Sequence, residues 1–326
     1  MKLWIEKIHL DLKVNWKLSR NQTTFKENFI VYLETSEGLF RSEVAPNIRY
    51  GETIENISTE FDLFKSNLNL NDIKSIEELK DSLQVVKLHA LRFGLESVIL
   101  SYLAKREGKD LTSYLGLEAP KKVATSFSMP IIPIHEIEEY LKPLKRFESL
   151  KIKVNAETGI EMLREIRKYS KAKIRVDANE GWNNLDEYLT FESTLQGMNV
   201  ELIEQPFPAS MHEEYKELKK RTSYKLLADE SIEDVGDFGE LSNQFHAVNI
   251  KLMKTGSLIR ARDLLHEAKK HGLESMMGCM IETTIGISYG MLFSGVVDYV
   301  DLDGFLLVKN EPFHLVSEAE GYLVLS

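Results

Sequence analysis

The pattern of apolar and polar positions changes character about a third of the way along the 326-residue chain. Apolar and polar residues alternate over 4–14 and 28–34, and the turn-like pair Glu37-Gly38 follows the second stretch. Alternation with a period of two is typical of strands that bury one face, so these segments predict an antiparallel meander. From 75 to 107 the apolar spacing becomes helical instead. We therefore expect an α+β domain over residues 1–118.

Short apolar segments rich in β-branched residues recur after this domain. They are 123–127, 150–154, 172–176, 200–203, 225–228, 247–250, 273–277 and 299–302. Amphipathic helical stretches such as 159–169 and 258–270 lie between most of them, which is typical of βα units and a parallel sheet. Eight such strands favour a barrel over an open sheet, although one sequence does not exclude the latter. We expect the barrel over 119–305, followed by a tail, 306–326, that is too short for another unit.

Charged residues stand at or just after the C-terminal ends of the predicted strands. They are Lys151, Lys153, Asp177, Glu204, Asp229, Lys251, Glu282, Asp301 and Asp303. From Lys153 to Lys251 the successive intervals are 24, 27, 25 and 22 residues, each about one βα unit. Barrel enzymes build their active sites where the C-terminal ends of the strands meet, so we expect these side chains to share one pocket.

Within this series, Asp177, Glu204 and Asp229 form an all-oxygen set. Such a set favours Mg²⁺, with Mn²⁺ as a substitute, over Zn²⁺, and three converging carboxylates repel one another without a cation. Lys153 and Lys251 flank the set and would face each other across a closed barrel. A lysine near a divalent cation and other lysines has a lowered pKa and can act as a base. Two bases on opposite faces of one carbon are what racemisation or epimerisation requires.

Composition narrows the class of protein. There are 41 Lys and Arg against 51 Asp and Glu, and the net charge of −10 argues against nonspecific nucleic-acid binding. The single cysteine, Cys279, excludes an internal disulfide and fits a reducing compartment. Glu6 and Asp11 argue against a signal peptide, and the weakly polar stretch 285–297 is too short to span a bilayer. We expect a cytoplasmic protein without nucleic-acid or membrane partners; the sequence is compatible with a homo-oligomer.

Five motifs together resemble the enolase superfamily, and within it the muconate-lactonizing enzyme subgroup. They are Lys151-Ile152-Lys153, Asp177-Ala178-Asn179-Glu180-Gly181-Trp182, Ile203-Glu204-Gln205-Pro206, Ala228-Asp229-Glu230-Ser231 and Asn249-Ile250-Lys251. The resemblance covers nearly the whole chain. It implies a modified TIM barrel, (β/α)7β, with an N-terminal α+β capping domain that the C-terminal tail completes. It also implies Mg²⁺-assisted abstraction of a proton α to a carboxylate, which gives an enediolate.

The pair Asp301 and Asp303 resembles the ammonium-binding motif of dipeptide epimerases of the L-Ala-D/L-Glu epimerase type. Two alternate carboxylates lie on one side of a strand and suit a cation. The resemblance therefore implies an isomerase that epimerises the C-terminal residue of a dipeptide such as L-Ala-L/D-Glu. Lys153 would act on the S isomer and Lys251 on the R isomer, with Lys151 assisting charge stabilisation.

The substrate side chain is less well defined by the sequence. In Ala-Glu epimerases an arginine of the first cap loop meets the glutamate side chain, which makes Arg20 one candidate and Arg49, in the second cap loop, another. Glu282 and Cys279 match the family's pattern around the seventh strand, where Cys279 is a pocket-wall residue rather than a nucleophile.

Other functions stay open from the sequence. The nearest is o-succinylbenzoate synthase, a lyase, or another cycloisomerase or racemase of the muconate-lactonizing type; the direction of Asp301 and Asp303 would separate it from an epimerase. A non-catalytic Mg²⁺-dependent binding protein is the second, and the presence of Lys153 and Lys251 argues against it.

Overall fold

A computed structural model places residues 1–17, 22–68, 70–118, 120 and 122–326. The N-terminal part is an antiparallel sheet in the order β1-β2-β3, formed by β1 (Lys2–Lys17), β2 (Gln22–Thr35) and β3 (Gly38–Val44). This is the predicted meander. The helices of this part are α1 (Ile54–Asn67), α2 (Ile76–Leu83), α3 (His89–Arg106) and α4 (Leu111–Tyr114).

The segment predicted to be helical, 75–107, forms the two helices α2 and α3. Glu60 of α1 accepts hydrogen bonds from the backbone N–H groups of Lys87 (2.5 Å) and Leu88 (3.0 Å). Those N–H groups are therefore not available to a continuous helix, and the chain turns between α2 and α3. Helix α1 has no counterpart among the predicted elements, so its carboxylate could not be foreseen as the cause of the break.

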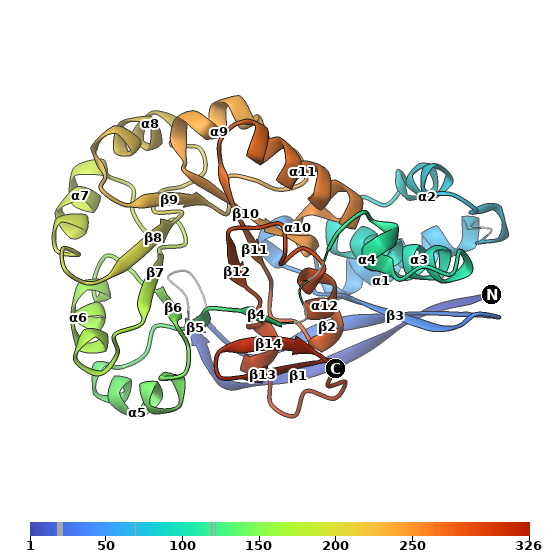
Figure 1. The fold of residues 1–326 in the computed structure, drawn as a ribbon, viewed down its shortest axis with the longest axis horizontal. Coiled ribbons are helices and arrows are strands. Elements are labelled where there is room, and N and C mark those ends of the chain that lie inside the picture. Colours follow the sequence, from blue (N-terminus) through green and yellow to red (C-terminus); the bar gives the residue numbers. More distant parts are fainter. Residues whose placement is uncertain (18–21, 69, 119, 121) are drawn as a thin grey trace.

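Among the described residues, eight parallel strands form the central sheet in the order β12-β11-β10-β9-β8-β7-β6-β5. They are β5 (Phe127–Met129), β6 (Ser149–Lys153), β7 (Lys173–Asp177), β8 (Val200–Glu204), β9 (Lys225–Ala228), β10 (Ala247–Lys251), β11 (Glu274–Gly278) and β12 (Tyr299–Asp301). The Ser126 N–H donates to the Val300 carbonyl (3.2 Å), which brings the two end strands together. The sheet thereby curls into the expected barrel (Figure 1).

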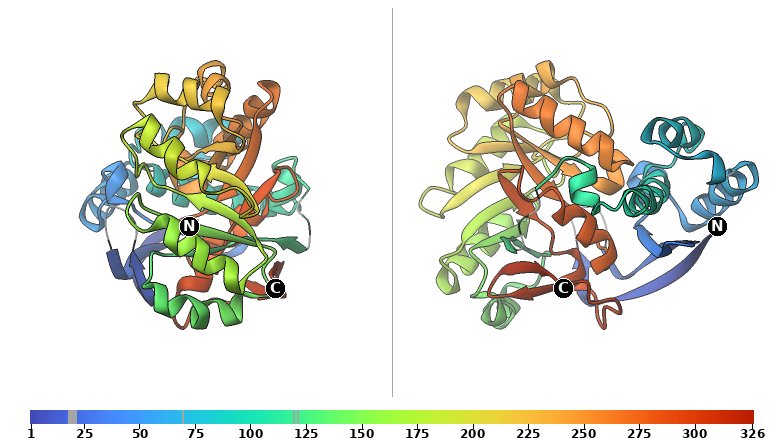
Figure 2. Two further views of the ribbon diagram at one scale, coloured as in Figure 1. Left: turned by 90° about the vertical axis from the view of Figure 1, so that its left-hand side faces the viewer. Right: turned by 45° about the vertical axis from the view of Figure 1, so that its right-hand side comes forward.

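Helices follow the strands and lie on the outside of the barrel, with the N-terminal domain beside it (Figure 2). They are α5 (Ile137–Leu141), α6 (Gly159–Tyr169), α7 (Leu185–Ser193), α8 (His212–Arg221), α9 (Phe238–Gln244), α10 (Leu252–Thr255), α11 (Leu258–Lys270) and α12 (Thr284–Met291). Within the described ranges, no helix has both the length and the apolar character that a membrane crossing requires.

The first predicted barrel strand, 123–127, is wrong in its bounds. Its first half is β4 (Lys122–Ala124), which pairs with the C-terminal tail, and β5 begins only at Phe127. Between them the Thr125 N–H donates to the Gly321 carbonyl, while the Thr125 hydroxyl accepts from the Leu302 N–H. The backbone thus changes partners at Thr125, and one apolar run serves two sheets.

The tail forms a hairpin of β13 (Val316–Ala319) and β14 (Tyr322–Leu325). Glu320 and Gly321 between them have φ angles of 53° and 78°, as a two-residue hairpin turn requires. Just before the hairpin, Val308 bridges to Leu12 of β1, and the Lys309 N–H donates to the Asp11 carbonyl (2.8 Å). The tail therefore contacts both β1 and β4. The domain boundaries at 118/119 and 305/306 stay a prediction.

The barrel interior is arranged in layers, because alternate residues of each strand point inward. Leu202, Leu227, Ala247 and Met276 form an apolar cluster apart from the main core, with Tyr299 packed against it. Leu202 and Leu227 lie two positions before Glu204 and Asp229, Ala247 lies four before Lys251, and Met276 lies two before Gly278 at the end of β11. They form an apolar floor under part of the site.

Candidate active site

The C-terminal ends of neighbouring barrel strands carry the predicted charged residues. Lys153 at the end of β6 is the register partner of Asp177 on β7, which in turn is the partner of Glu204 on β8. Asp229 follows β9 directly and Lys251 ends β10. Asp177, Glu204 and Asp229 are at most 3% exposed, so the carboxylates lie inside the barrel mouth, as their spacing predicts.

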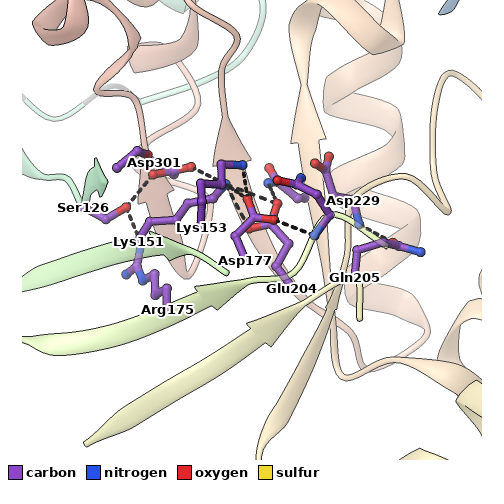
Figure 3. A network of polar contacts seen from close by, with 12 residues as sticks. Ser126, Lys151, Lys153, Arg175, Asp177, Glu204, Gln205, Asp229 and Asp301 are labelled. Atoms are coloured by element: carbon purple, nitrogen blue, oxygen red, sulfur yellow. Dashed lines mark hydrogen bonds and ion pairs between the residues drawn. The ribbon is translucent and has the colours of Figure 1, made fainter. Parts of the chain in front are cut away.

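Lysine ammonium groups lie between these carboxylates (Figure 3). The Lys151 Nζ atom is 3.1 Å from Asp177, 2.9 Å from Glu204 and 2.9 Å from Asp301. Lys153 pairs with Asp177. At the other end of the row, Lys251 is 2.7 Å from Asp229 Oδ2.

The pKa values reflect this crowding. Burial, followed by the neighbouring Asp177 charge, raises the pKa of Glu204 to about 7. Burial opposes ionisation of Asp229 as well, but the ammonium groups of Lys251 and Lys254 outweigh it and hold the pKa of Asp229 well below its usual range. We expected a divalent cation and other lysines to lower the pKa of the lysines that are candidate bases. In the structure the pKa of Lys251 is instead raised above its ordinary value. Burial alone would lower it, but the nearby Asp229 charge has the larger effect.

The donor set fits a hard divalent cation. Asp177, Glu204 and Asp229 offer only oxygen atoms, and the Asp177 charge lies close enough to Glu204 to raise its pKa, so a cation between them would relieve this repulsion. Among the described residues no three His, Cys, Asp or Glu side chains gather into a ready metal cage. The three carboxylates do not come together as metal ligands would, because each is paired with a lysine ammonium group.

Neighbouring side chains fix the orientation of these carboxylates. The Lys254 ammonium group donates to Asp229 Oδ1 (2.6 Å), to the Asp229 carbonyl (2.6 Å) and to the Ile232 carbonyl (3.1 Å), which uses all three of its hydrogens. The Gln205 side chain accepts from the Asp229 N–H (2.9 Å), and the Asn249 amide donates to Glu204 (2.9 Å).

Sequence reasoning did not assign roles to Lys254, Gln205 or Asn249. Lys254 carried a signal that could have found it, since it is the only charged residue between 252 and 259 and follows Lys251 by three positions.

Asp301 and Asp303 lie beside this row and have different partners. Asp301 accepts from the Ser126 hydroxyl (2.5 Å) in addition to Lys151. Asp303 accepts from the N–H of Ser128 (2.5 Å) and from its hydroxyl (3.2 Å). Burial, followed by the Asp301 charge, raises the pKa of Asp303 to about 7. Among the described contacts, Asp303 has no ammonium partner of its own, unlike Asp301.

The remaining candidate substrate-binding residues differ in what surrounds them, and one of them is not described. Arg20 lies outside the described residues. Arg49 makes two 2.8 Å contacts with the two carboxylate oxygens of Glu180, so its charge is balanced by this chain. Glu282 is 3% exposed and accepts from the Met280 N–H (2.7 Å); burial and then the Glu43 charge raise its pKa to about 8. Burial raises the pKa of the Cys279 thiol, which keeps it protonated beside the Asp301 carbonyl.

Comparisons with known proteins agree with this geometry. A family model described as enolase C-terminal domain-like matches residues 135–312. An L-Ala-D/L-amino acid epimerase of Flavobacterium johnsoniae is 31% identical over 318 residues, which cover 95% of this chain and 93% of that protein. Another, of Pedosphaera parvula, is 32% identical over 335 residues, covering 99% of this chain and 95% of that protein.

A solved structure extends the comparison to three dimensions. The dipeptide epimerase of Methylococcus capsulatus, complexed with Mg and the dipeptide L-Arg-D-Lys, matches with a TM-score of 0.88 and 26% identity. The match covers 100% of this chain and 96% of that chain. The likeness therefore includes the N-terminal domain as well as the barrel.

Proposed function

The chain belongs to the enolase superfamily, and we propose that it is a Mg²⁺-dependent dipeptide epimerase. It inverts the α-carbon of the C-terminal residue of a dipeptide such as L-Ala-L-Glu or L-Ala-D-Glu. The names of its relatives, at about 30% identity over nearly their full length, support an isomerase of this kind. The proposal then depends on whether the residues of this chain can exchange a proton on both faces of one carbon.

One observation carries the proposal: the two candidate bases lie on opposite sides of the barrel. Lys153 ends β6 and Lys251 ends β10, and β7, β8 and β9 separate these strands in the sheet order. Strands four apart in a barrel of eight face each other across its axis. A substrate α-carbon held between the two lysines would therefore meet one base on each face, as inversion requires.

The rest of the site would hold the substrate in that position. Asp177, Glu204 and Asp229 would bind Mg²⁺, which when present supplies positive charge to the carboxylate oxygens of the substrate. Lys151 donates its hydrogens toward the same region and would stabilise developing negative charge there.

Asp301 and Asp303 would hold the N-terminal ammonium group of the dipeptide. Asp303 supports this assignment because burial and the Asp301 charge raise its pKa, and an ammonium group beside it would relieve both effects. At the other end of the substrate, Arg20 is the better candidate for reading an acidic side chain, because Arg49 is already paired with Glu180. Mn²⁺ as a substitute, a cytoplasmic location and a homo-oligomer stay predictions.

Proton exchange with solvent tests the proposal. We expect the wild-type enzyme with Mg²⁺ in D₂O to place deuterium at the α-carbon of the C-terminal residue of L-Ala-L-Glu and to form the other epimer. Lys153→Ala and Lys251→Ala should each lose epimerisation by at least 1,000-fold, because each removes the base on one face. Each variant should still exchange the α-proton of one epimer, through the lysine that remains. Mass spectrometry measures the deuterium and chiral chromatography the epimer.

A surface lysine provides the control. Lys168 of α6 pairs with Glu165 on the outside of the barrel, and Lys168→Ala should keep wild-type activity. Full epimerisation by either site variant would contradict the two-base assignment. Absence of deuterium uptake by the wild-type enzyme across a library of dipeptides would overturn the proposed function itself.

A further inference from the structure

Arg175 lies beneath the candidate site, in a layer of the barrel interior where the next two strands, β8 and β9, carry leucines. It is on β7, two residues before Asp177, and is 7% exposed. The corresponding positions, two before the strand-end acids on β8 and β9, are Leu202 and Leu227. An arginine keeps its charge in a protein interior, and a buried charge destabilises the fold unless partners surround it. Its contacts therefore show what the guanidinium group is held for.

The guanidinium group of Arg175 reaches in two directions. Its Nε–H donates to Glu201 (2.8 Å), which balances the charge. Its Nη1 atom donates to the Val300 carbonyl of β12 (2.9 Å) and to the Ser126 hydroxyl (3.2 Å). The contact with Glu201 is sufficient to explain charge balance. The two Nη1 contacts instead join β7 to the strand that carries Asp301 and to the residue that precedes β5.

The chemistry of these groups fixes the direction of each hydrogen bond. A guanidinium group only donates, so the Ser126 oxygen must accept from Arg175. The single hydrogen of the Ser126 hydroxyl is then directed to Asp301 Oδ1 at 2.5 Å, the closest acceptor described around it. The other oxygen of Asp301, Oδ2, is 2.9 Å from the Lys151 ammonium group. Figure 3 shows these four side chains next to one another at one side of the carboxylate row.

We propose that Arg175 is a positioning residue that orients the Ser126 hydroxyl and thereby holds Asp301 and Lys151 in their working positions. Without the guanidinium group, the Ser126 hydrogen is free to turn to the Val300 carbonyl, 3.5 Å away, and Asp301 Oδ1 loses its partner. The carboxylate can then rotate away from the Lys151 ammonium group. The assignment rests on the proposed function, in which Lys151 stabilises charge that develops during proton transfer.

Two substitutions break this chain of contacts at different links. Ser126→Ala removes one hydroxyl and leaves every charge in place, whereas Arg175→Met removes the guanidinium group at similar length. Each should lower kcat for L-Ala-L-Glu about tenfold, the size expected for one hydrogen bond to a charged group. Because both links belong to one chain of contacts that ends at Asp301, the double variant should be no more than about twofold slower than the slower single variant. Lys173→Met is the matched control, since Lys173 pairs with Glu201 from the exposed side and should stay within twofold of wild type.

A measurement without substrate separates positioning from general loss of structure. In the ¹H–¹⁵N spectrum of enzyme labelled with ¹⁵N-lysine, the Lys151 ammonium signal can be assigned from its absence in Lys151→Met. We expect that signal to shift or broaden in Ser126→Ala and in Arg175→Met but to stay unchanged in Lys173→Met. This readout reports the environment of Lys151 directly, which a role confined to stability would not alter.

The proposal is overturned if Ser126→Ala and Arg175→Met lower the melting temperature but leave kcat and the Lys151 signal unchanged. It is also overturned if the two effects on kcat multiply in the double variant. Should Arg175→Met fail to fold, Ser126→Ala decides alone, because it removes a single oxygen atom. If the wild-type enzyme does not epimerise dipeptides, the proposed function fails, while the Lys151 signal still decides whether Arg175 acts through Ser126.

Discussion

Glu43 offers the sharpest test of how the N-terminal domain is fixed to the barrel. This residue of β3 is fully buried. Its side chain crosses from the N-terminal domain to the barrel and reaches the N-terminus of α12. Its carboxylate accepts hydrogen bonds from the Thr283 N–H (2.9 Å), the Thr283 hydroxyl (2.7 Å), the Gly286 N–H (3.0 Å) and the Asn28 amide (2.8 Å). The carboxylate thus caps a barrel helix from another part of the chain.

The expected effect of Glu43→Gln follows from these four donors. Glutamine keeps one acceptor oxygen but turns an NH₂ group toward N–H donors, so about half of the contacts are lost. Hydrogen bonds to a charged group contribute about 1.5 to 3 kcal/mol each. Burial raises the pKa of Glu43, so the charge itself is costly and part of this loss is recovered in the neutral variant. We expect a net decrease of about 2 to 4 kcal/mol in the free energy of unfolding.

Hydrogen exchange shows which backbone amides lose protection in the variant and by how much. In Glu43→Gln the amides of Thr283 and Gly286 should exchange at least tenfold faster. Glu96 of α3 is the matched control, because it accepts from the Ser257 hydroxyl (2.7 Å) and the Leu258 N–H (2.5 Å) at the start of α11. Glu96→Gln should loosen Leu258 and leave Thr283 protected. Unchanged exchange at Thr283 and Gly286 in Glu43→Gln would refute the reasoning.

Two further predictions concern pH and the metal. Burial raises the pKa of Glu52 to about 7, so the folded state binds more protons than the unfolded chain between about pH 4.5 and 7, and the free energy of unfolding falls by about 3 kcal/mol as the pH rises through that range. Glu52→Gln should remove only this group's contribution, about 2 to 3 kcal/mol between pH 5 and pH 8 in urea unfolding, because other buried carboxyl groups such as Glu282 also have raised pKa values. An unchanged difference between the two pH values would contradict it. Asp177→Asn should weaken Mg²⁺ binding at least tenfold in calorimetric titration without substrate, and equal affinity would remove Asp177 from the ligand set.

The location of the site was predictable because it depends on a repeating unit. One βα unit returns the chain to the same end of the barrel. Intervals of 22 to 27 residues, each about one such unit, therefore bring Lys153, Asp177, Glu204, Asp229 and Lys251 together. The barrel strands themselves could be predicted because a short apolar run marks each of them in the sequence. The exception at 123–127 arose where that run continued through a change of partner strand.

The sequence could not show side-chain contacts between elements that no repeating spacing along the chain relates to each other. Glu60 interrupts the helical pattern at 87–88, and Glu43 caps a helix 240 residues away. Both contacts depend on how α1 and β3 pack, and no spacing along the chain encodes that. The pairing of Arg49 with Glu180 is of the same kind: an arginine in a cap loop gives no sign in sequence of which carboxylate it will meet.

The layer beneath the site was easier to predict than these contacts between elements, because alternation along each strand fixes it once the strand ends are known. Subtracting two from each strand-end position names the next inward residue on that strand. On β8, β9 and β11 these residues are Leu202, Leu227 and Met276, which need no explanation beyond burial. On β6 and β7 they are Lys151 and Arg175, whose burial is stable only with partners. On β10 the same rule gives Asn249, a buried amide that donates to Glu204 (2.9 Å). The charged residues of this layer therefore lie on β6 and β7, on the side of Asp301, and the supports of the proposed ammonium-binding residues come from that side.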